Sequence, residues 1–172
     1  MSAQVIHASI DERGHASGGK AGDQTGREVC IAPFNPDRGW NKVLRCKSSR
    51  IIKKMITIGK KLCKSSKVGY DQGQRNTLHT QMKKYKYDAS KYVDEGSKSE
   101  TDCSAFMTCI AIAGGVKKLE YSANGNAPTT STMVGAFTKT RKFKSMSYKK
   151  GMRLKPGDIL VKEGSHTAMY IG

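Results

Sequence analysis

The chain has 172 residues, a formal net charge of +17, a hydrophobic fraction of 37% and 18 glycines. This composition suits one globular domain and excludes a coiled coil or a collagen-like chain. No apolar run approaches the ~20 residues of a membrane-spanning helix, and the N-terminus lacks the pattern of a signal peptide. We therefore expect a single domain over residues 1–172, with no transmembrane segment.

The first forty residues begin with a short apolar stretch that includes Val5, Ile6 and Ile10, followed by a glycine-rich loop from Gly14 to Gly26. This pattern indicates a short strand and a structured surface loop. We expect the polar, glycine-rich segment 1–40 to be an integral part of the domain.

Three helices are predicted in the middle of the chain. Ser48 or Ser49 can cap a helix that runs to about Cys63, with most of its lysines on the solvent face. A second helix is predicted over about 74–85. The third, over 103–113, is the best defined, because it is strongly apolar and a pair of glycines follows it.

The C-terminal part is predicted to contain a short helix near 133–137, a strand near 143–148 and then a hairpin. The hairpin strands are expected at 159–161 and 166–171, so that His166 begins the last strand. Helices first and strands last predict the α+β class, with N-terminal helices packed on a small antiparallel sheet.

The positive charge is unevenly distributed. From Asn41 to Lys67 there are ten Lys or Arg residues and no Asp or Glu. Such a segment attracts polyanions, which include nucleic acid, an anionic membrane surface and the anionic polymers of a bacterial wall, while a solvated basic face is the simpler alternative. The segment has few aromatic residues for base stacking and matches no nucleic-acid-binding fold, so specific nucleic-acid binding is not expected.

The five cysteines are irregularly spaced, form no CxxC pair and do not lie beside the four histidines at the intervals of a zinc site. Reduced, mostly buried thiols with one functional member are the simplest interpretation. We expect neither a metal nor a cofactor.

Cys103 is the candidate for the functional thiol. Asp102 is a good N-cap, which places Cys103 in the first turn of the third helix. Backbone N–H groups at that end lower the pKa of a thiol and can receive an oxyanion. His166, at the start of a strand, can face this helix end and accept the thiol proton. The alternative is a core cysteine and a structural histidine.

Two sequence segments, DCSAF at 102–106 and GDILVKEGSHTA at 157–168, resemble the active-site motifs of NlpC-like and CHAP-type peptidoglycan hydrolases. Three others resemble the catalytic domains of phage endolysins of Gram-positive hosts: SIDERG at 9–14, GGKAGDQTGREV at 18–29 and GYDQGQRNTL at 69–78.

This resemblance implies a papain-like fold and cleavage of a peptidoglycan amide bond, with Cys103 as nucleophile and His166 as general base. The bond is that of an amidase or of a stem-peptide endopeptidase. The expected partners are peptidoglycan and anionic wall polymers. We expect a monomer that is made in the host cytoplasm and acts on the cell wall after release.

NlpC-like enzymes carry a third polar residue on the strand after the histidine, whereas only six residues follow His166 in this sequence. The hypothesis is that the N-terminal strand pairs beside the strand of His166 and supplies the orienting group. The candidates are Asp11, Glu12, Asp23 and Gln24. Alternatively, Asp23 and Gln24 only stabilise a glycine-rich turn.

Tyr70 matches the position of a tyrosine that helps to form the oxyanion site in NlpC-like enzymes, although a buried structural tyrosine is an equal alternative. A competing hypothesis for the whole chain is a catalytically inactive basic module that binds cell-wall polymers or nucleic acid.

Overall fold

The computed structural model describes residues 2–119, 121 and 125–172. Its main feature is a six-stranded sheet in the order β2-β1-β8-β7-β3-β6, in which every neighbouring pair is antiparallel. The predicted α+β class is thereby confirmed. The strands are β1 (Gln4–Ala8), β2 (Val29–Pro33), β3 (Lys42–Cys46), β6 (Phe143–Ser147), β7 (Ile159–Lys162) and β8 (His166–Tyr170).

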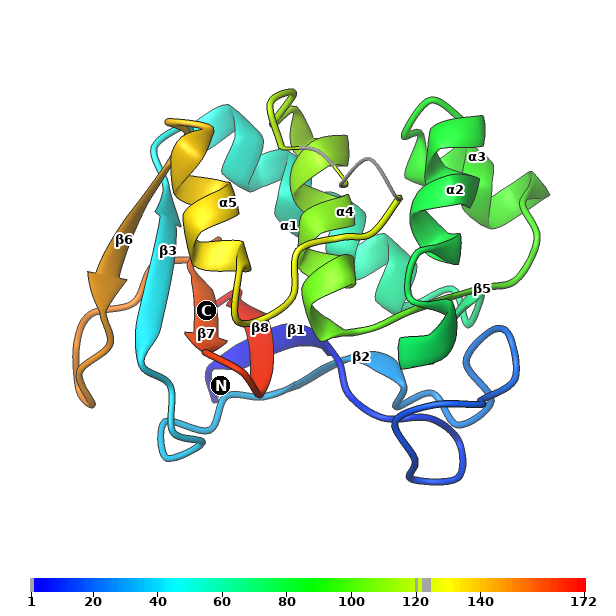
Figure 1. The fold of residues 1–172 in the computed structure, drawn as a ribbon, viewed down its shortest axis with the longest axis horizontal. Helices are drawn as coiled ribbons and strands as arrows, with labels where there is room; N and C mark the ends of the chain where they lie inside the picture. The colour runs from blue at the N-terminus through cyan, green and yellow to red at the C-terminus, as the bar shows by residue number, and fades with distance from the viewer. Residues whose placement is uncertain (1, 120, 122–124) are drawn as a thin grey trace.

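The helices gather together beside this sheet (Figure 1). In the described part of the chain they are α1 (Ser49–Cys63), α2 (Thr77–Lys84), α3 (Ala89–Glu95), α4 (Cys103–Gly114) and α5 (Met133–Lys139). Helix α4 contacts α1, α2, β1 and β8, and ten of its twelve residues are buried. A helix that is apolar on all sides is typical of this central position.

A second, two-stranded sheet consists of β4 (Val68–Tyr70) and β5 (Ser99–Thr101), which run parallel. A 3₁₀ turn, η1 (Gln72–Gln74), follows β4. Because Tyr70 pairs with Thr101, the end of β4 lies beside the chain that enters α4.

The predicted helix boundaries depend on caps, and the structure contains these caps. Ser48 accepts a hydrogen bond from the N–H of Ile51 at the start of α1, and Asp102 accepts one from the N–H of Ala105 at the start of α4. Gly115 ends α4 in the left-handed region, at φ +115°. The helix expected over 74–85 is divided instead into η1 and α2.

The predicted order of elements was wrong, because three strands precede the first helix and the sheet is larger than expected. Strands β2 and β3 are each five residues long and lack a clear alternation of exposed and buried residues. Their pairing partners are β1, β7 and β6, so long-range pairing determines them more than local pattern does.

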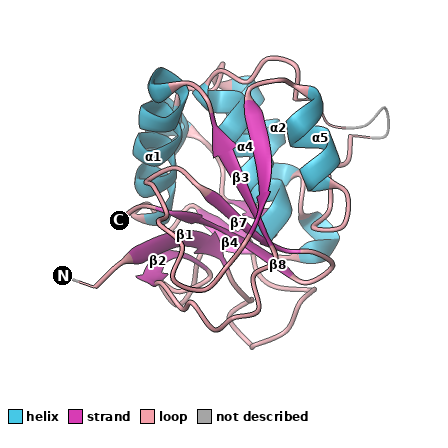
Figure 2. Cartoon of the chain, turned by 90° about the vertical axis from the view of Figure 1, so that its left-hand side faces the viewer, coloured by secondary structure: helices cyan, strands magenta, loops and turns pink. Residues whose placement is uncertain are grey.

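Both faces of the six-stranded sheet are covered (Figure 2). Ile6, Leu44 and Met169 belong to the large core shared with the helices. On the other face, Val43 and Leu160 pack in a smaller cluster of buried residues with Trp40, Val5 and Ala168. Within the described residues, no helix combines the length and apolar character that crossing a bilayer requires.

Candidate active site

The N-terminus of α4, which carries Cys103, packs against β8, which begins at His166. The backbone N–H groups of Thr167 and Ser104 are near enough to the Cys103 sulfur to act on the pKa of the thiol. Because Thr167 directly follows His166, the thiol lies against the first peptide of β8. The two side chains are almost buried, with exposed fractions of 6% for Cys103 and 7% for His166.

His166 has a second partner, His7, which the sequence argument did not consider as a site residue. The distance from His7 Nδ1 to His166 Nε2 is 3.1 Å, and the rings meet edge to face. Strand β1 carries His7 and pairs antiparallel with β8, in a register that matches Ile6 with Met169. The predicted pairing of the N-terminal strand beside that of His166 is therefore confirmed.

Burial, together with the positive charge of Arg38, lowers the pKa of His166 to about 3 and that of His7 to about 4. Both rings are therefore neutral at neutral pH. One nitrogen of the contact must donate and the other accept. If His166 donates from Nε2, its Nδ1 is an acceptor that can take a proton from the thiol.

Trp40 covers the His166 ring from the side opposite the helices. The two rings are tilted, with centroids 5.9 Å apart, and only 6% of Trp40 is exposed. The indole N–H donates to the carbonyl of Asn35 at 2.9 Å, which fixes the loop between β2 and β3. Water access to the histidine pair is thereby reduced.

The Cys103 thiol is protonated in this arrangement. Its pKa is raised to about 11, mainly by burial and also by the charge of Asp102, while the two backbone N–H groups and Arg75 limit the rise. The lowered pKa expected at a helix N-terminus is thus outweighed, because the helix effect on a charge is only about 0.3–1 kcal/mol. A base must take the proton before the sulfur can attack.

Asp102 and Arg75 form a nearly buried ion pair beside the thiol. Arg75 Nε lies 2.6 Å from Asp102 Oδ2, and Arg75 also donates to the Ser104 hydroxyl at 2.8 Å. Arg75 further donates to the carbonyls of Ala127 and Pro128, at 2.7 and 3.0 Å. One guanidinium therefore joins the start of α4 to the segment before α5.

Tyr70 lies near the thiol, as its pairing with Thr101 requires, and it is 4% exposed. Burial raises its pKa to about 12, and the neighbouring charges of Cys103 and Asp102 act in the same direction. The phenol is therefore protonated. Gln72 donates from Nε2 to the phenol oxygen at 3.1 Å, which leaves the O–H hydrogen able to donate to another group.

The four residues proposed from the sequence to orient His166 lie in the loop between β1 and β2, where they stabilise turns. The side-chain hydrogen bonds that the structure gives these four residues stay within residues 11–29, as Asp11 with Arg13 and His15, Glu12 with Lys20, Asp23 with Thr25 and Gly26, and Gln24 with Ala21 and Gly22. The structure thus brings His7 to His166 in their place.

Beside this loop, Glu100 on β5 is buried, with both carboxyl oxygens lacking a hydrogen-bond partner in the structure. Burial, together with the charges of Asp71, Glu28, Glu12 and Asp11, raises its pKa to about 8. The carboxyl is therefore mostly neutral at pH 7. In the described residues no three His, Cys, Asp or Glu side chains are arranged to hold a metal ion.

Glu100→Gln is expected to stabilise the protein by roughly 1–3 kcal/mol at pH 7 and to have a smaller effect at pH 4.5. A raised carboxyl pKa gives a stability contribution that is fully present below the usual value of 4.5 and is lost as pH rises through about 8. Glutamine does not ionise, so the variant escapes this loss. Urea unfolding at both pH values measures it, and an equal difference at both would contradict the explanation.

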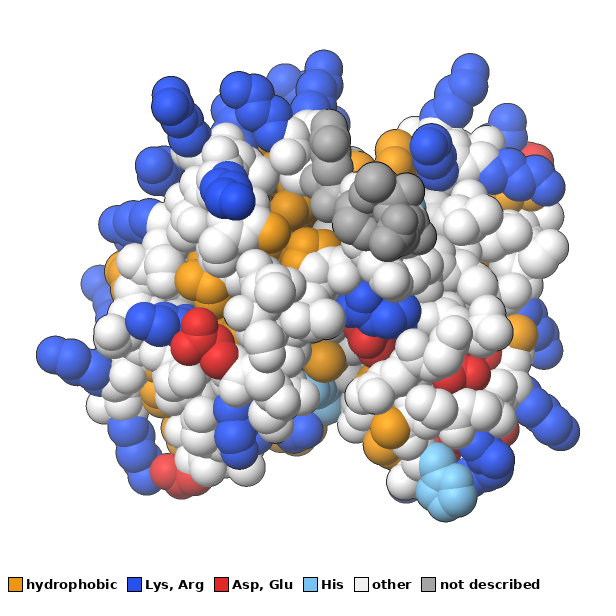
Figure 3. Space-filling model, in the orientation of Figure 1, with side chains coloured by type: hydrophobic (Ala, Val, Ile, Leu, Met, Phe, Trp, Pro, Cys, Tyr) orange, Lys and Arg blue, Asp and Glu red, His pale blue; other side chains and the backbone are white. Residues whose placement is uncertain are grey.

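The face of the molecule in Figure 3 is hollowed between two lobes, and hydrophobic and histidine side chains are visible in the notch. The largest of the described cavities, about 1050 Å³, lies elsewhere, along α1 and the start of α3. Neither Cys103 nor His166 lines this cavity.

A family model described as an endolysin-like domain matches residues 5–172 of the chain. No curated protein and no solved structure gives a significant match. The matched range includes His7 on β1, Cys103 at the start of α4 and His166 on β8.

Proposed function

Because the chain belongs to the endolysin-like domain family, we propose that it hydrolyses an amide bond of bacterial peptidoglycan, with Cys103 as nucleophile and His166 as general base. The observation that carries this proposal is the packing of α4, with Cys103 at its N-terminus, against β8, with His166 at its start. The protein acts on the cell wall, as a phage endolysin does. The fold type that suits this pair is the papain-like one, with the cysteine at a helix start and the histidine on a strand.

The reaction begins with transfer of the thiol proton to Nδ1 of His166. The sulfur attacks the amide carbonyl, and the C–N bond then breaks as the imidazolium gives its proton to the leaving amine. A water molecule, deprotonated by the same ring, hydrolyses the thioester and frees the thiol. A neutral resting state of both groups is compatible with general-base catalysis, in which the thiol proton moves to the imidazole as the sulfur attacks the carbonyl.

Two donors are available for the oxyanion that forms at the carbonyl. The backbone N–H groups in the first turn of α4 are one, and the protonated hydroxyl of Tyr70 is the other. Gln72, through its bond to the phenol oxygen, would hold Tyr70 in position.

His7 acts as a positioning residue for His166. Its Nδ1 accepts from Nε2–H of His166, which fixes the tautomer whose Nδ1 can act as base. The imidazole of His7 on β1 therefore orients His166, as the third polar residue does in NlpC-like enzymes.

His7→Phe is expected to lower kcat by about 10–100-fold with little change in KM, because the ring keeps its shape but loses the acceptor. His7→Asn retains an acceptor oxygen and should recover much of the loss. Steady-state kinetics on soluble peptidoglycan fragments checks both. If the His7→Phe variant and the wild type have equal kcat, His7 does not position His166.

The class of reaction is tested by the products formed from purified walls. Amide hydrolysis releases new amino groups and no new reducing ends, whereas a glycosidase would release reducing ends. Mass spectrometry of the fragments then assigns the bond, between muramic acid and L-alanine for an amidase or within the stem peptide for an endopeptidase. New reducing ends without new amines would refute the proposed function.

A further inference from the structure

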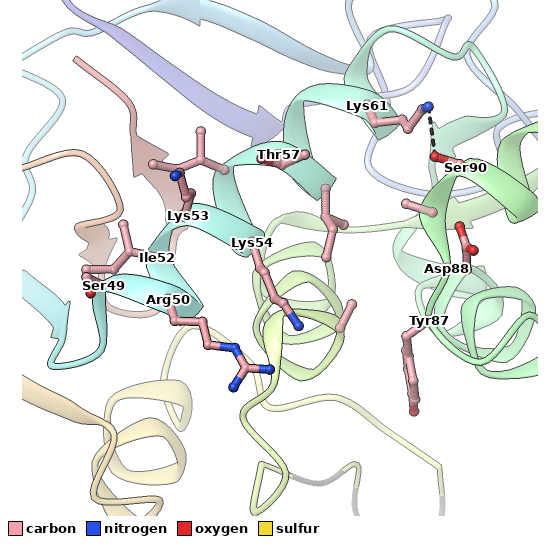
Figure 4. A pocket seen from close by; sticks show the side chains of 14 residues that line it. Ser49, Arg50, Ile52, Lys53, Lys54, Thr57, Lys61, Tyr87, Asp88 and Ser90 are labelled. Carbon is pink, nitrogen blue, oxygen red and sulfur yellow. Dashed lines mark hydrogen bonds between the residues drawn. The ribbon is translucent and has the colours of Figure 1, made fainter.

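A groove of about 1050 Å³ lies between α1, the start of α3 and the C-terminal end of α4 (Figure 4). Ala113 of α4 lines it, ten residues after Cys103, so the groove is about 15 Å along the helix from the thiol. It is therefore separate from the proposed catalytic cleft.

The groove has an apolar floor and a basic rim. Ile52, Ile56 and Ile58 of α1 are partly buried and pack against the core, and the rest of each side chain faces the groove. Four basic side chains line the groove, from Arg50, Lys53, Lys54 and Lys61.

One acidic side chain, Asp88, lines the same groove, and it caps α3 by accepting from the N–H of Lys91 at 3.0 Å. Lys61 donates to the Ser90 hydroxyl at 2.9 Å and so joins α1 to α3. In Figure 4 the side chains of Arg50 and Lys54 extend toward the space in front of Tyr87. The positive charge of Arg50 and Lys54 is thus available to a ligand.

The charges of α1 are unfavourable for the helix itself. Arg50 and Lys54 are four residues apart, a spacing at which like charges destabilise a helix by a few tenths of a kcal/mol. The helix contains no acidic residue that could offset them, and neither does the rest of 41–67. A bound anion would remove this repulsion.

We propose that the groove binds a linear polyol phosphate, a flexible chain that alternates phosphodiester groups with short polyol units. The phosphates would meet Arg50 and Lys54, and the carbon atoms of the polyol units would lie along the isoleucine floor. The choice of this polyanion, which is a component of Gram-positive walls, rests on the proposed function. The groove would hold the protein on the wall while the other end of α4 carries out hydrolysis.

Two other polyanions fit the groove less well. Tyr87 is the one aromatic residue among the lining side chains, so successive bases of a single-stranded nucleic acid would find no stacking platform. Insertion into a bilayer would need exposed large apolar side chains, whereas the three isoleucines are partly buried against the core. The exposed large hydrophobic residue identified in the described chain, Ile10, lies outside the groove.

The test measures binding of lipid-free poly(glycerol phosphate) by calorimetry at about 0.15 M salt. Arg50→Gln/Lys54→Gln is expected to weaken binding roughly tenfold, because two phosphate contacts are lost. The matched control, Lys149→Gln/Arg153→Gln, removes the same charge from exposed residues away from the groove and should weaken binding less than about twofold. Equal weakening by both pairs would overturn the proposal.

A second pair of variants tests the groove by adding charge. Thr57 is exposed on α1 and lines the groove, so Thr57→Glu should weaken polymer binding several-fold while Thr57→Gln should not. Single-stranded DNA of equal phosphate number and anionic vesicles are measured alongside. Binding of either that is as tight as the polymer and equally sensitive to these variants would overturn the assignment to a polyol phosphate.

Failure of this inference can be distinguished from failure of the proposed function. The groove variants should digest peptidoglycan stripped of anionic polymers at the wild-type rate. Cys103→Ala should bind the polymer with wild-type affinity. Unchanged polymer binding by the groove variants, with Cys103-dependent hydrolysis intact, would refute the groove alone, and groove-dependent polymer binding without any Cys103-dependent hydrolysis would refute the enzyme alone.

Discussion

Cys103→Ala is expected to lower the rate of wall hydrolysis by about 10⁴-fold or more, because no other group can form the thioester. The side chain is small and lies at the edge of the core, so the fold should persist. Clearing of purified walls at matched protein concentration, together with thermal unfolding, measures both effects.

Cys109→Ala is the matched control. Cys109 lies on the same helix, six residues further on, and is completely buried. Its removal should lower stability by about 1 kcal/mol through the cavity that it leaves, with hydrolysis retained. A Cys103→Ala variant that clears walls at the wild-type rate would favour the alternative of a catalytically inactive basic binding module.

Arg75→Leu is expected to lower the free energy of unfolding by about 3–5 kcal/mol. The substitution leaves the Asp102 carboxylate nearly buried without its cation, and it removes donors from Ser104 and from two carbonyls before α5. Urea unfolding monitored by circular dichroism measures the loss.

Arg153→Leu serves as the control for this change, because Arg153 is exposed; its effect should stay within about 0.5 kcal/mol. In the double variant Arg75→Leu/Asp102→Asn the unpaired charge is gone, so part of the loss should be recovered. A loss under about 1 kcal/mol for Arg75→Leu alone would show that the ion pair does not hold this region together.

Much of the helical structure could be predicted because local signals determine it. Ser48 and Asp102 mark the starts of α1 and α4, and Gly115 marks an end, and each signal acts through its nearest neighbours in the chain. The C-terminal hairpin was equally local. These elements place Cys103 at a helix start and His166 at a strand start, which was enough to identify the candidate pair.

The rest of the site depends on contacts between residues far apart in the sequence. His7 and His166 are 159 positions apart, and their contact follows from the pairing of β1 with β8. A histidine next to two apolar residues on a predicted strand was the one local signal for His7. Arg75 and Trp40 gave none, because nothing in their surroundings indicates the partners Asp102 and His166.

The sequence also could not show whether the helix N-terminus or burial has the larger effect on the pKa of the Cys103 thiol. The helix start at Asp102 predicted a lowered pKa for Cys103, but the degree of burial depends on packing against β8. Burial dominates in the structure, so the thiol of Cys103 keeps its proton at neutral pH.

The central claim is that the thiol of Cys103 is the attacking group, and partial alkylation tests it most directly. The protein is treated with iodoacetamide for increasing times, with and without soluble peptidoglycan fragments. Peptide mass spectrometry gives the alkylated fraction of each cysteine, and wall clearing gives the remaining activity. We predict that activity falls in proportion to the alkylated fraction of Cys103 and that the fragments slow both changes. Full alkylation of Cys103 with activity retained would contradict the account.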